Sequence, residues 1–368
     1  MRNVKVTHLS SVHTTFDIRI FLKECKSLAN AGFEVNYVVA DQQHNGLHSG
    51  VNIISISKAN GRLERMTKVV KKVYEVALEL NSDVYHFHDP ELIPVGLLLK
   101  SKGKKVIYDA HEDVPRDILS KTWIPKYVRS IIANTFEVLE DFAARRFDTI
   151  VTATPYIQER FLRIGAKSVN INNYPFLEEF NLPTVNWAEK ENIVCYVGGI
   201  NEIRGVHEMV RAIGQTNAQL AIGGLFSSEA DYQKAIHLDG WSQVKELGQL
   251  HRNEVSDLFN KSRAGLVIFH PEENHINAQP NKMFEYMSAG LPVIASNFPL
   301  WREIIEGNQC GICVDPLNPR EIADAINWIM EHPEKSKEMG LKGRRAIENR
   351  YNWETEQKNL VQLYKELV

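Results

Sequence analysis

The chain has 368 residues, of which 43% are hydrophobic and 24% charged, and such a composition is ordinary for two or three globular domains. A formal net charge of −3 gives no excess of cations that would predict a nucleic-acid-binding protein. Four cysteines are too few for a disulfide framework, and neither a signal peptide nor an apolar run long enough to cross a bilayer is evident. We therefore expect a cytoplasmic protein.

The first half of the chain alternates short apolar strands with helices. The predicted strands are Val4–His8, Glu34–Val39, Val51–Ser57, Val84–His88, Val106–Asp109, Thr149–Thr152 and Ser168–Ile171. The predicted helices are Arg19–Ala31, Leu63–Leu80, Leu92–Lys100, the long amphipathic segment Pro125–Phe147 and Ile157–Ile164. The apolar residues of Leu63–Leu80 recur every three or four positions, so we expect this stripe to face the core. Strand and helix in alternation predict a doubly wound parallel sheet.

A stretch from Asn172 to about Lys190 contains two prolines and no hydrophobic period, and we interpret it as a linker. A second α/β alternation follows. Its predicted strands are Ile193–Val197, Leu220–Ile222, Val244–Leu247, Leu266–Phe269, Val293–Ala295 and Ile312–Val314. We divide the chain into an acceptor-side domain (1–180), a nucleotide-sugar-binding domain (181–350) and a final helix (351–368) that packs back on the first domain. Ligands of such sheets bind beyond the carboxyl ends of the strands, so we expect a cleft there.

The stretch Pro280–Ser296 combines a loop, a short helix that ends at Gly290, and a buried strand. Lys282 falls in the first helical turn, where the helix dipole disfavours a cation unless an anion is bound. Glu285 follows on about the same face, where a carboxylate can accept hydrogen bonds from ribose hydroxyls. An ordinary surface pair is the alternative interpretation of these two residues.

A second glycine-containing segment follows the predicted strand Ile193–Val197. Gly198 and Gly199 allow the backbone to approach a ligand closely, and Arg204 can bind a phosphate with two hydrogen bonds. Alone, a glycine pair after a strand is weak evidence for a phosphate site.

Together, these motifs resemble the nucleotide-binding half of the GT-B glycosyltransferases, specifically the retaining glycosyltransferase family 4, whose donor-site helix matches Asn281–Ser296. The resemblance implies a GT-B fold, with two Rossmann-like, doubly wound parallel-sheet domains facing a central cleft. It also implies a set of donor-binding residues. These are Gly198, Gly199, Arg204, Asn277, Asn281, Lys282 and Glu285.

Two positions depart from the family pattern. The family usually has two glutamates eight positions apart, and Asn277 stands in place of the first. Of two basic residues that hold the donor diphosphate, the chain keeps Arg204 but has Ile200 or a neighbour at the other position. We therefore expect Lys282 to carry more of the diphosphate charge.

In the first domain, His111 directly follows a predicted strand. The resemblance implies that it is the family's histidine beside the transferred sugar, so we assign catalysis to His111 and Glu285. Without the resemblance, a histidine in such a loop is more often structural. The segment from Val12 to Arg19 replaces the glycine-rich first loop of many relatives. We assign His13, Asp17, Arg19 and His88 to the acceptor side.

His86 and His88 lie two residues apart on one face of a strand, a spacing that metal-dependent hydrolases also use. A catalytic metal needs a third ligand, typically a carboxylate or histidine from another strand end, and the predicted strands do not make the closed eight-stranded barrel of such hydrolases. The Asp-x-Asp pair with which the other glycosyltransferase architecture holds its metal is absent from the sequence. We therefore expect no metal and no cofactor.

The sequence thus predicts a glycosyltransferase that moves a hexose-type sugar from a UDP- or GDP-linked donor to an acceptor hydroxyl with retention. We expect the acceptor to be a glycan or a lipid-linked glycan in bacterial surface polysaccharide or glycolipid synthesis, and peripheral contact with the inner membrane. Two alternatives stay open. One is a nucleotide-sugar epimerase of GT-B architecture, and the other is a non-catalytic subunit that binds a sugar nucleotide.

Overall fold

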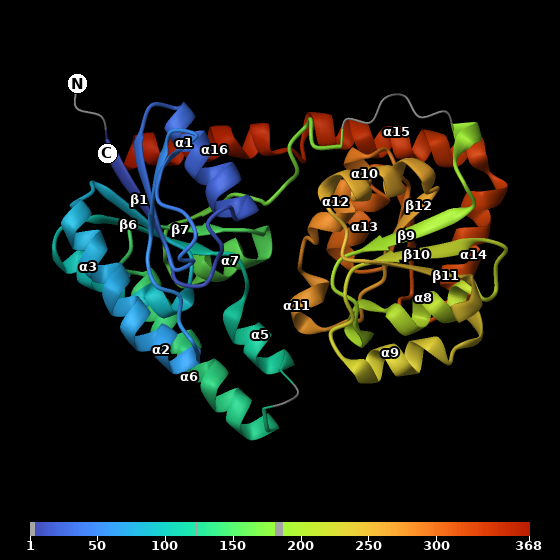
Figure 1. Cartoon of the computed structure of the whole chain (residues 1–368), viewed down its shortest axis with the longest axis horizontal. Coiled ribbons are helices and arrows are strands. Elements are labelled where there is room, and N and C mark those ends of the chain that lie inside the picture. Colours follow the sequence, from blue (N-terminus) through green and yellow to red (C-terminus); the bar gives the residue numbers. More distant parts are fainter. Residues whose placement is uncertain (1–3, 122–123, 181–186) are drawn as a thin grey trace. The chain divides into compact units, whose positions relative to one another are not determined.

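The computed structural model describes residues 4–121, 124–180 and 187–368. The chain divides into two compact units. The first runs to Asn173 and includes the final helix, Trp353–Val368, and the second is Tyr174–Asn352. Each unit is a sheet of mostly parallel strands with helices on both faces (Figure 1). Residues 181–186, part of the predicted linker, lie outside the described residues.

The sheet of the first unit has the strand order β3-β4-β2-β1-β5-β6-β7-β8. Its strands are β1 (Lys5–Ser10), β2 (Glu34–Val39), β3 (Gly46–His48), β4 (Val51–Ser55), β5 (Val84–Phe87), β6 (Lys105–Ala110), β7 (Thr149–Thr152) and β8 (Ser168–Asn170). All pairs are parallel except β3 with β4. The chain winds outward in opposite directions from β1 and β5, so the switch point of the sheet lies between these two strands.

Helices cover both faces of this sheet. They are η1 (Ile18–Cys25), α1 (Lys26–Asn30), α2 (Arg62–Glu64), η2 (Arg65–Val69), α3 (Val70–Leu80), η3 (Pro90–Leu92), α4 (Ile93–Ser101), α5 (Val114–Ser120), α6 (Lys126–Ala144), α7 (Pro155–Arg163) and α16 (Trp353–Leu367). Hydrogen bonds tie α16 to the unit. The indole nitrogen of Trp353 donates to Ser27 Oγ at 3.0 Å, and the Tyr364 hydroxyl lies 2.8 Å from Nδ1 of His86.

The second unit has the strand order β11-β10-β9-β12-β13-β14, which is the order of a dinucleotide-binding sheet with its switch point between β9 and β12. Its strands are β9 (Ile193–Val197), β10 (Gln219–Gly223), β11 (Val244–Gly248), β12 (Ala264–Val267), β13 (Val293–Ser296) and β14 (Gly311–Val314). Gly265 of β12 lets a helix approach closely, because a Cβ there would lie 2.3 Å from the ring of Tyr286.

The helices of the second unit follow the strands in alternation. They are η4 (Trp187–Glu189), η5 (Glu202–Arg204), α8 (Val206–Ile213), α9 (Glu229–Ile236), η6 (Asp239–Gln243), α10 (Arg252–Lys261), α11 (Glu273–Ile276), α12 (Asn281–Ser288), α13 (Pro299–Ile305), α14 (Pro319–Glu331) and α15 (Pro333–Asn349). No helix of the described residues is long and apolar enough to span a bilayer. The predicted two-sheet α/β fold is confirmed.

Three local predictions need correction. The apolar stripe of the predicted helix Leu63–Leu80 does not face the core throughout, because Leu63 is 79% and Met66 53% exposed. The short antiparallel edge strand β3 was not predicted. The predicted helix Arg19–Ala31 begins with the π-helical segment η1, which Asp17 caps by accepting a hydrogen bond from the backbone of Ile20.

Candidate functional site

The glycine pair of the second unit lies directly under two cations. Gly198 follows β9 with a φ of 132°, a region that favours glycine. A Cβ on Gly198 would lie 3.0 Å from Nζ of Lys282, and one on Gly199 would lie 2.8 Å from a terminal nitrogen of Arg204. Without side chains at these two positions, the two cations can reach over the carboxyl end of the strand beside the switch point.

Lys282 is a buried ammonium without a hydrogen-bond acceptor among the described residues. It lies in the first turn of α12, and its Nζ is 3.6 Å from the centroid of the Tyr196 ring. Burial and the nearby charge of Arg204 lower the pKa of Lys282 well below its usual value, although Glu285 counteracts them. A buried, unpaired charge is costly, so this end of the helix is built for an anion.

Arg204 is held beside Lys282 by its local backbone. The side chain of Asn201 accepts a hydrogen bond from the Arg204 backbone at 3.0 Å. Gly205 then turns the chain with a φ of 76°, and a Cβ there would lie 1.9 Å from the carbonyl oxygen of Ile268. Nη1 of Arg204 donates to the carbonyl of Gly199 at 3.3 Å. The guanidinium is therefore fixed above the glycine pair.

Glu285 forms an ion pair that the sequence did not predict. Arg252, the first residue of α10, donates to Oε1 of Glu285 from both terminal nitrogens at 2.9 Å, and its Nε donates to Glu179 at 2.9 Å. Burial opposes the charge of Arg252, but Glu285 and Glu179 outweigh burial and raise its pKa. No local pattern could have revealed this group, because its members come from three separate parts of the chain.

Asn277 and Asn281 flank the loop that leads into α12. Asn277 follows α11 and is half-buried, whereas Asn281 begins α12 and is exposed. The indole nitrogen of Trp301 donates to the carbonyl of Ala278 at 2.7 Å and anchors this loop. The structure thus brings the glycine pair, Arg204 and Lys282 into direct contact and places Asn277 and Asn281 at the entry of the same helix.

In the first unit, Arg19 organises the end of β6. Its Nε and Nη2 donate to the two carboxylate oxygens of Asp109 at 3.0 and 2.9 Å, and its Nη1 donates to the carbonyl of Ile171 at 3.0 Å. Nε also lies 3.1 Å from Glu24. We expected Arg19 to contact an acceptor. Because the guanidinium is buried and occupied by these groups, we reassign it to the positioning of Asp109.

His111 lies next to Asp109, just beyond β6. Its Nδ1 is 3.4 Å from a carboxylate oxygen of Asp109, and its ring stacks on His88 with centroids 5.3 Å apart. Burial opposes the ionisation of Asp109, but Arg19 and then His111 outweigh it and hold the pKa of that carboxyl well below its usual range. The side chain of His111 is 20% exposed. Both ring nitrogens of His111 are buried and have no hydrogen-bond partner among the described residues, so the exposed part of this side chain is carbon.

The side chain of His13, on the same unit, is 30% exposed. Its Nδ1 is 3.2 Å from Asp17, its Nε2 is 3.4 Å from Asp89, and its ring meets His111 edge to face at 5.5 Å. Burial opposes the charge of His13, but Asp17 and Asp89 outweigh it and raise its pKa. The expected acceptor-side residues His13 and Asp17 thus lie beside His111, whereas His88 is buried and can act only through its neighbours.

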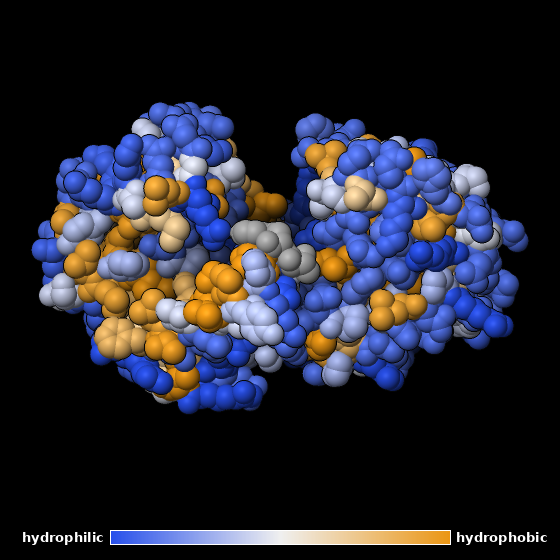
Figure 2. All heavy atoms as spheres, turned by 90° about the horizontal axis from the view of Figure 1, so that it is seen from below, coloured by the Kyte–Doolittle hydropathy of each residue, from blue (hydrophilic) through white to orange (hydrophobic). Residues whose placement is uncertain are grey.

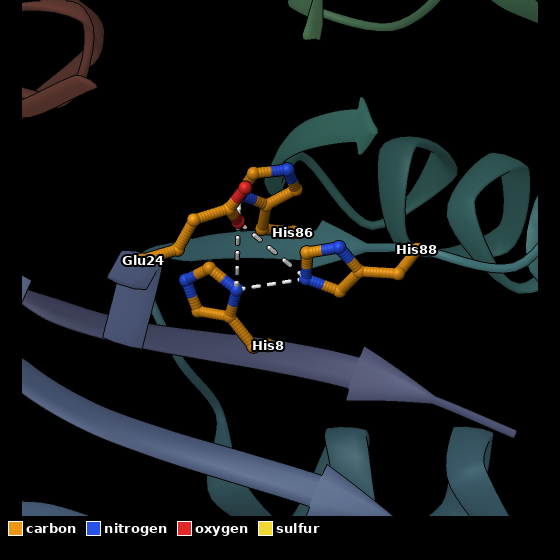
Figure 3. A group of neighbouring side chains, drawn as sticks. All are labelled: His8, Glu24, His86 and His88. Atoms are coloured by element: carbon orange, nitrogen blue, oxygen red, sulfur yellow. Dashed lines mark hydrogen bonds and ion pairs between the residues drawn. The ribbon is translucent and has the colours of Figure 1, made fainter. Parts of the chain in front are cut away.

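His88 belongs to a buried cluster that also contains His8, His86 and Glu24 (Figure 3). Oε2 of Glu24 is 3.8 Å from His8 and 3.9 Å from His86 and from His88. Burial lowers the pKa of His8 and His86 and takes that of His88 to about 4, and it raises the pKa of Glu24. At neutral pH the three imidazoles are therefore uncharged.

This cluster supplies the third histidine and the carboxylate that the sequence did not identify. However, the facing nitrogens of His8 and His88 are 2.9 Å apart, closer than the roughly 3.3 Å between ligands of a tetrahedral zinc ion. The nitrogen of His86 that faces Glu24 already has the hydroxyl of Tyr364 at 2.8 Å. We therefore interpret the cluster as a hydrogen-bonded support for Asp109 and His88.

Two family models match the chain. The model described as glycosyl transferases group 1 matches residues 178–346, and that of the glycosyl transferase 4-like domain matches residues 19–173. Each match falls largely within one structural unit.

Individual proteins are similar to the chain over most of its length. D-rhamnosyltransferase WbpZ of Pseudomonas aeruginosa is 25% identical over 288 residues, which are 77% of this chain and 72% of that protein. O-antigen chain mannosyltransferase C of Escherichia coli is 22% identical over 313 residues, 82% and 79% of the two chains. The crystal structure of Anabaena HepE in complex with UDP-glucose shares the fold with a TM-score of 0.74, at 17% identity over 99% of this chain and 100% of that one.

Proposed function

Since the chain belongs to the group 1 glycosyltransferases, with a GT-B fold and a glycosyl transferase 4-like first unit, we propose that it transfers a hexose-type sugar from a UDP- or GDP-linked donor to an acceptor hydroxyl with retention. The observation that carries this proposal is the buried, unpaired ammonium of Lys282 at the first turn of α12. A diphosphate supplies the negative charge that this position lacks.

In this proposal the second unit binds the donor. Lys282, Arg204 and the amino-terminal turn of α12 stabilise the negative charge that grows on the departing diphosphate. The backbone of the glycine pair admits the phosphates closely, and Glu285 accepts hydrogen bonds from the ribose. Asn277 and Asn281 contact the sugar end of the donor. The support for these roles is the contact of Lys282 and Arg204 with the glycine pair.

The first unit supplies His111, which contacts a hydroxyl of the transferred sugar near the reacting carbon. Asp109 orients this imidazole, and Arg19 and His88 hold Asp109 in turn. His13 and Asp17 contact the acceptor. The support for these assignments is that two partly exposed side chains, His13 and His111, lie edge to face beside buried carboxylates.

The relatives guide the choice of partners. HepE binds UDP-glucose, and the two curated relatives carry the names of a rhamnosyltransferase and an O-antigen mannosyltransferase. We propose a glycan or lipid-linked glycan acceptor in surface polysaccharide or glycolipid synthesis, and a cytoplasmic enzyme in peripheral contact with the membrane. We also propose that donor binding needs no metal, because Lys282 and Arg204 supply cations at the diphosphate; turnover should then be equal with and without excess chelator.

A thermal-shift panel of UDP-, GDP- and dTDP-sugars on the purified chain, followed by product analysis, tests the proposal. We expect one nucleotide series to raise the melting temperature and Lys282→Ala to remove the shift. Lys245→Ala, at an exposed lysine of β11, is the matched control. An isomerised sugar nucleotide without acceptor would point to an epimerase instead, and binding without turnover would point to a non-catalytic subunit.

A further inference from the structure

One face of α6 is apolar and uncovered. The exposed apolar side chains recur at helical spacing along the 19-residue helix. They include Tyr127, Ile131, Ile132, Val138, Leu139 and Phe142, which are 43 to 85% exposed. The opposite face is buried and holds Glu140, which accepts a hydrogen bond from Tyr108 at 2.8 Å and pairs with Arg160 at 2.6 Å. These buried contacts fix the orientation of α6, and as a consequence its apolar face points outward.

The segment formed by α2 and η2 also exposes apolar side chains, and it adds cations. Leu63 and Met66 are 79% and 53% exposed, between the basic residues Arg62, Arg65 and Lys68. Figure 1 draws α2 and α6 at the same end of the first unit, and in Figure 2, which looks onto this end, orange spheres gather among blue ones.

A cavity of about 590 Å³ lies beside α2. Its cationic lining residues are Lys58, Arg62, Arg65 and Lys121, the residue that follows α5. None of the described residues that line it is acidic. Carboxylates pair with part of this positive charge, because Arg65 lies 2.8 Å from Glu91 and Lys121 lies 2.8 Å from Asp117, whereas no ion pair is found for Lys58 and Arg62 among the described residues. The exposed apolar side chains of α6, of α2 and of η2 thus lie at an end of the first unit that also carries cations. We call this surface the α6 face.

We infer that the α6 face docks the first unit on the surface of an anionic lipid bilayer. Apolar side chains at this density enter the region between headgroups and acyl chains, while lysine and arginine at the border reach the phosphates. Charge decides against a second copy of this chain, because two α6 faces in contact would bring their own cations together. The inference deepens the proposed function, because such docking brings a transferase to a membrane-bound acceptor.

Flotation of the purified full chain with vesicles tests the inference without donor or acceptor. The vesicles are phosphatidylcholine alone or phosphatidylcholine mixed with phosphatidylglycerol. We expect binding to the mixed vesicles that weakens as salt is raised. The double substitution Ile131→Asp with Leu139→Asp should lower the partition coefficient at least tenfold, since charged groups oppose insertion. Leu341→Asp, at a leucine of α15 that is 50% exposed, is the control and should bind as the wild type does.

A second pair of variants tests the cations separately. Lys126, the first residue of α6, is an exposed cation next to the apolar side chains of that helix. Arg62→Glu with Lys126→Glu should lower binding to the mixed vesicles several-fold and remove most of the salt dependence. The inference is overturned if the wild type binds neither kind of vesicle, or if the aspartate variant floats as well as the control. It is equally overturned if light scattering shows a dimer that the aspartate variant abolishes. A donor-induced rise in melting temperature that persists in all variants separates these outcomes from a failure of the proposed transferase.

Discussion

Each unit contains a buried cation near the carboxyl ends of its strands, and the two differ in what surrounds them. Arg19 in the first unit meets Asp109, Glu24 and a backbone carbonyl. Lys282 in the second meets an aromatic ring and no acceptor among the described residues. Their pKa values shift in opposite directions. Burial disfavours both charges, but carboxylates raise the pKa of Arg19 while that of Lys282 falls.

Under the proposed function, this difference separates a structural charge from one that binds a ligand. The charge of Arg19 is neutralised within the fold, so it stabilises the unit at all times. The charge of Lys282 lowers the stability of the free unit, and the proposed diphosphate would offset this cost on binding. Burial alone would have ranked the two cations as equals, and only their partners distinguish them.

The largest effect should come from Arg19→Met. It leaves Asp109 buried without its bidentate partner, so the first unit should lose about 3–5 kcal/mol of unfolding free energy. Denaturant-induced unfolding, monitored at the transition of the first unit, measures this loss of free energy. Arg163→Met removes an exposed pair with Glu159 and should change nothing measurable. Equal stability of the two variants would contradict the structural role of Arg19.

Lys282→Met should affect nucleotide affinity rather than folding stability. Removing an unpaired buried ammonium should leave stability unchanged or raise it, while affinity for UDP or GDP should fall by about 1.5–3 kcal/mol, the range for hydrogen bonds to charged groups. Isothermal titration and thermal unfolding of the same samples give both quantities. Lys245→Met serves as control. A loss of stability as large as that of Arg19→Met would contradict the proposal that Arg19 and Lys282 have different roles.

His111→Ala tests the imidazole of His111 rather than the buried charges. We expect turnover to fall tenfold or more, because the side chain is proposed to contact the transferred sugar, while the melting temperature stays constant. Steady-state rates with the best donor of the panel measure this. His237→Ala, at an exposed histidine after α9, should match the wild type. Full activity of His111→Ala would return this histidine to a structural role.

The pH dependence of nucleotide binding tests the depressed pKa of Lys282. The bound diphosphate favours the charged ammonium, so binding takes up a proton between the low pKa of the free protein and the higher pKa of the complex. Affinity should therefore fall as pH rises through that window, by at most about tenfold per pH unit. Titrations in buffers of different ionisation enthalpy count the protons. Lys282→Arg, which stays charged, should flatten the dependence.

Much of the fold follows from the sequence alone. The buried strand β13 (Val293–Ser296) contains the apolar run Val293–Ala295, and its position was therefore predicted nearly to the residue. The end of α12 was predicted equally well, because glycine and proline mark it. The glycine pair, Arg204 and Lys282 were also predicted, because each belongs to a local motif. Contacts between distant parts of the chain were not. Tyr364 reaches His8 across 356 positions, and no local period encodes such a pairing.

Periodicity also does not tell what covers an apolar stripe. The pattern that led us to expect a core-facing helix over Leu63–Leu80 is correct at Val73 and Ala77 but wrong at Leu63 and Met66. The same pattern in α6 gives an exposed face. A hydrophobic period reports that a face avoids water. Whether a sheet or another partner covers it is decided by the tertiary structure.

The smallest effect should come from Glu285→Gln. The carboxylate both pairs with Arg252 and is proposed to accept from the ribose, and an amide presents a donor where an acceptor is needed. We expect nucleotide affinity to fall by roughly 1 kcal/mol, or several-fold. Glu179→Gln is the matched control, since Glu179 shares Arg252 but has no proposed donor contact. If both variants weaken binding equally, Glu285 acts only by positioning Arg252. If Glu285→Gln alone weakens it, the ribose contact stands, and calorimetric titration of sugar-free UDP or GDP distinguishes the two results.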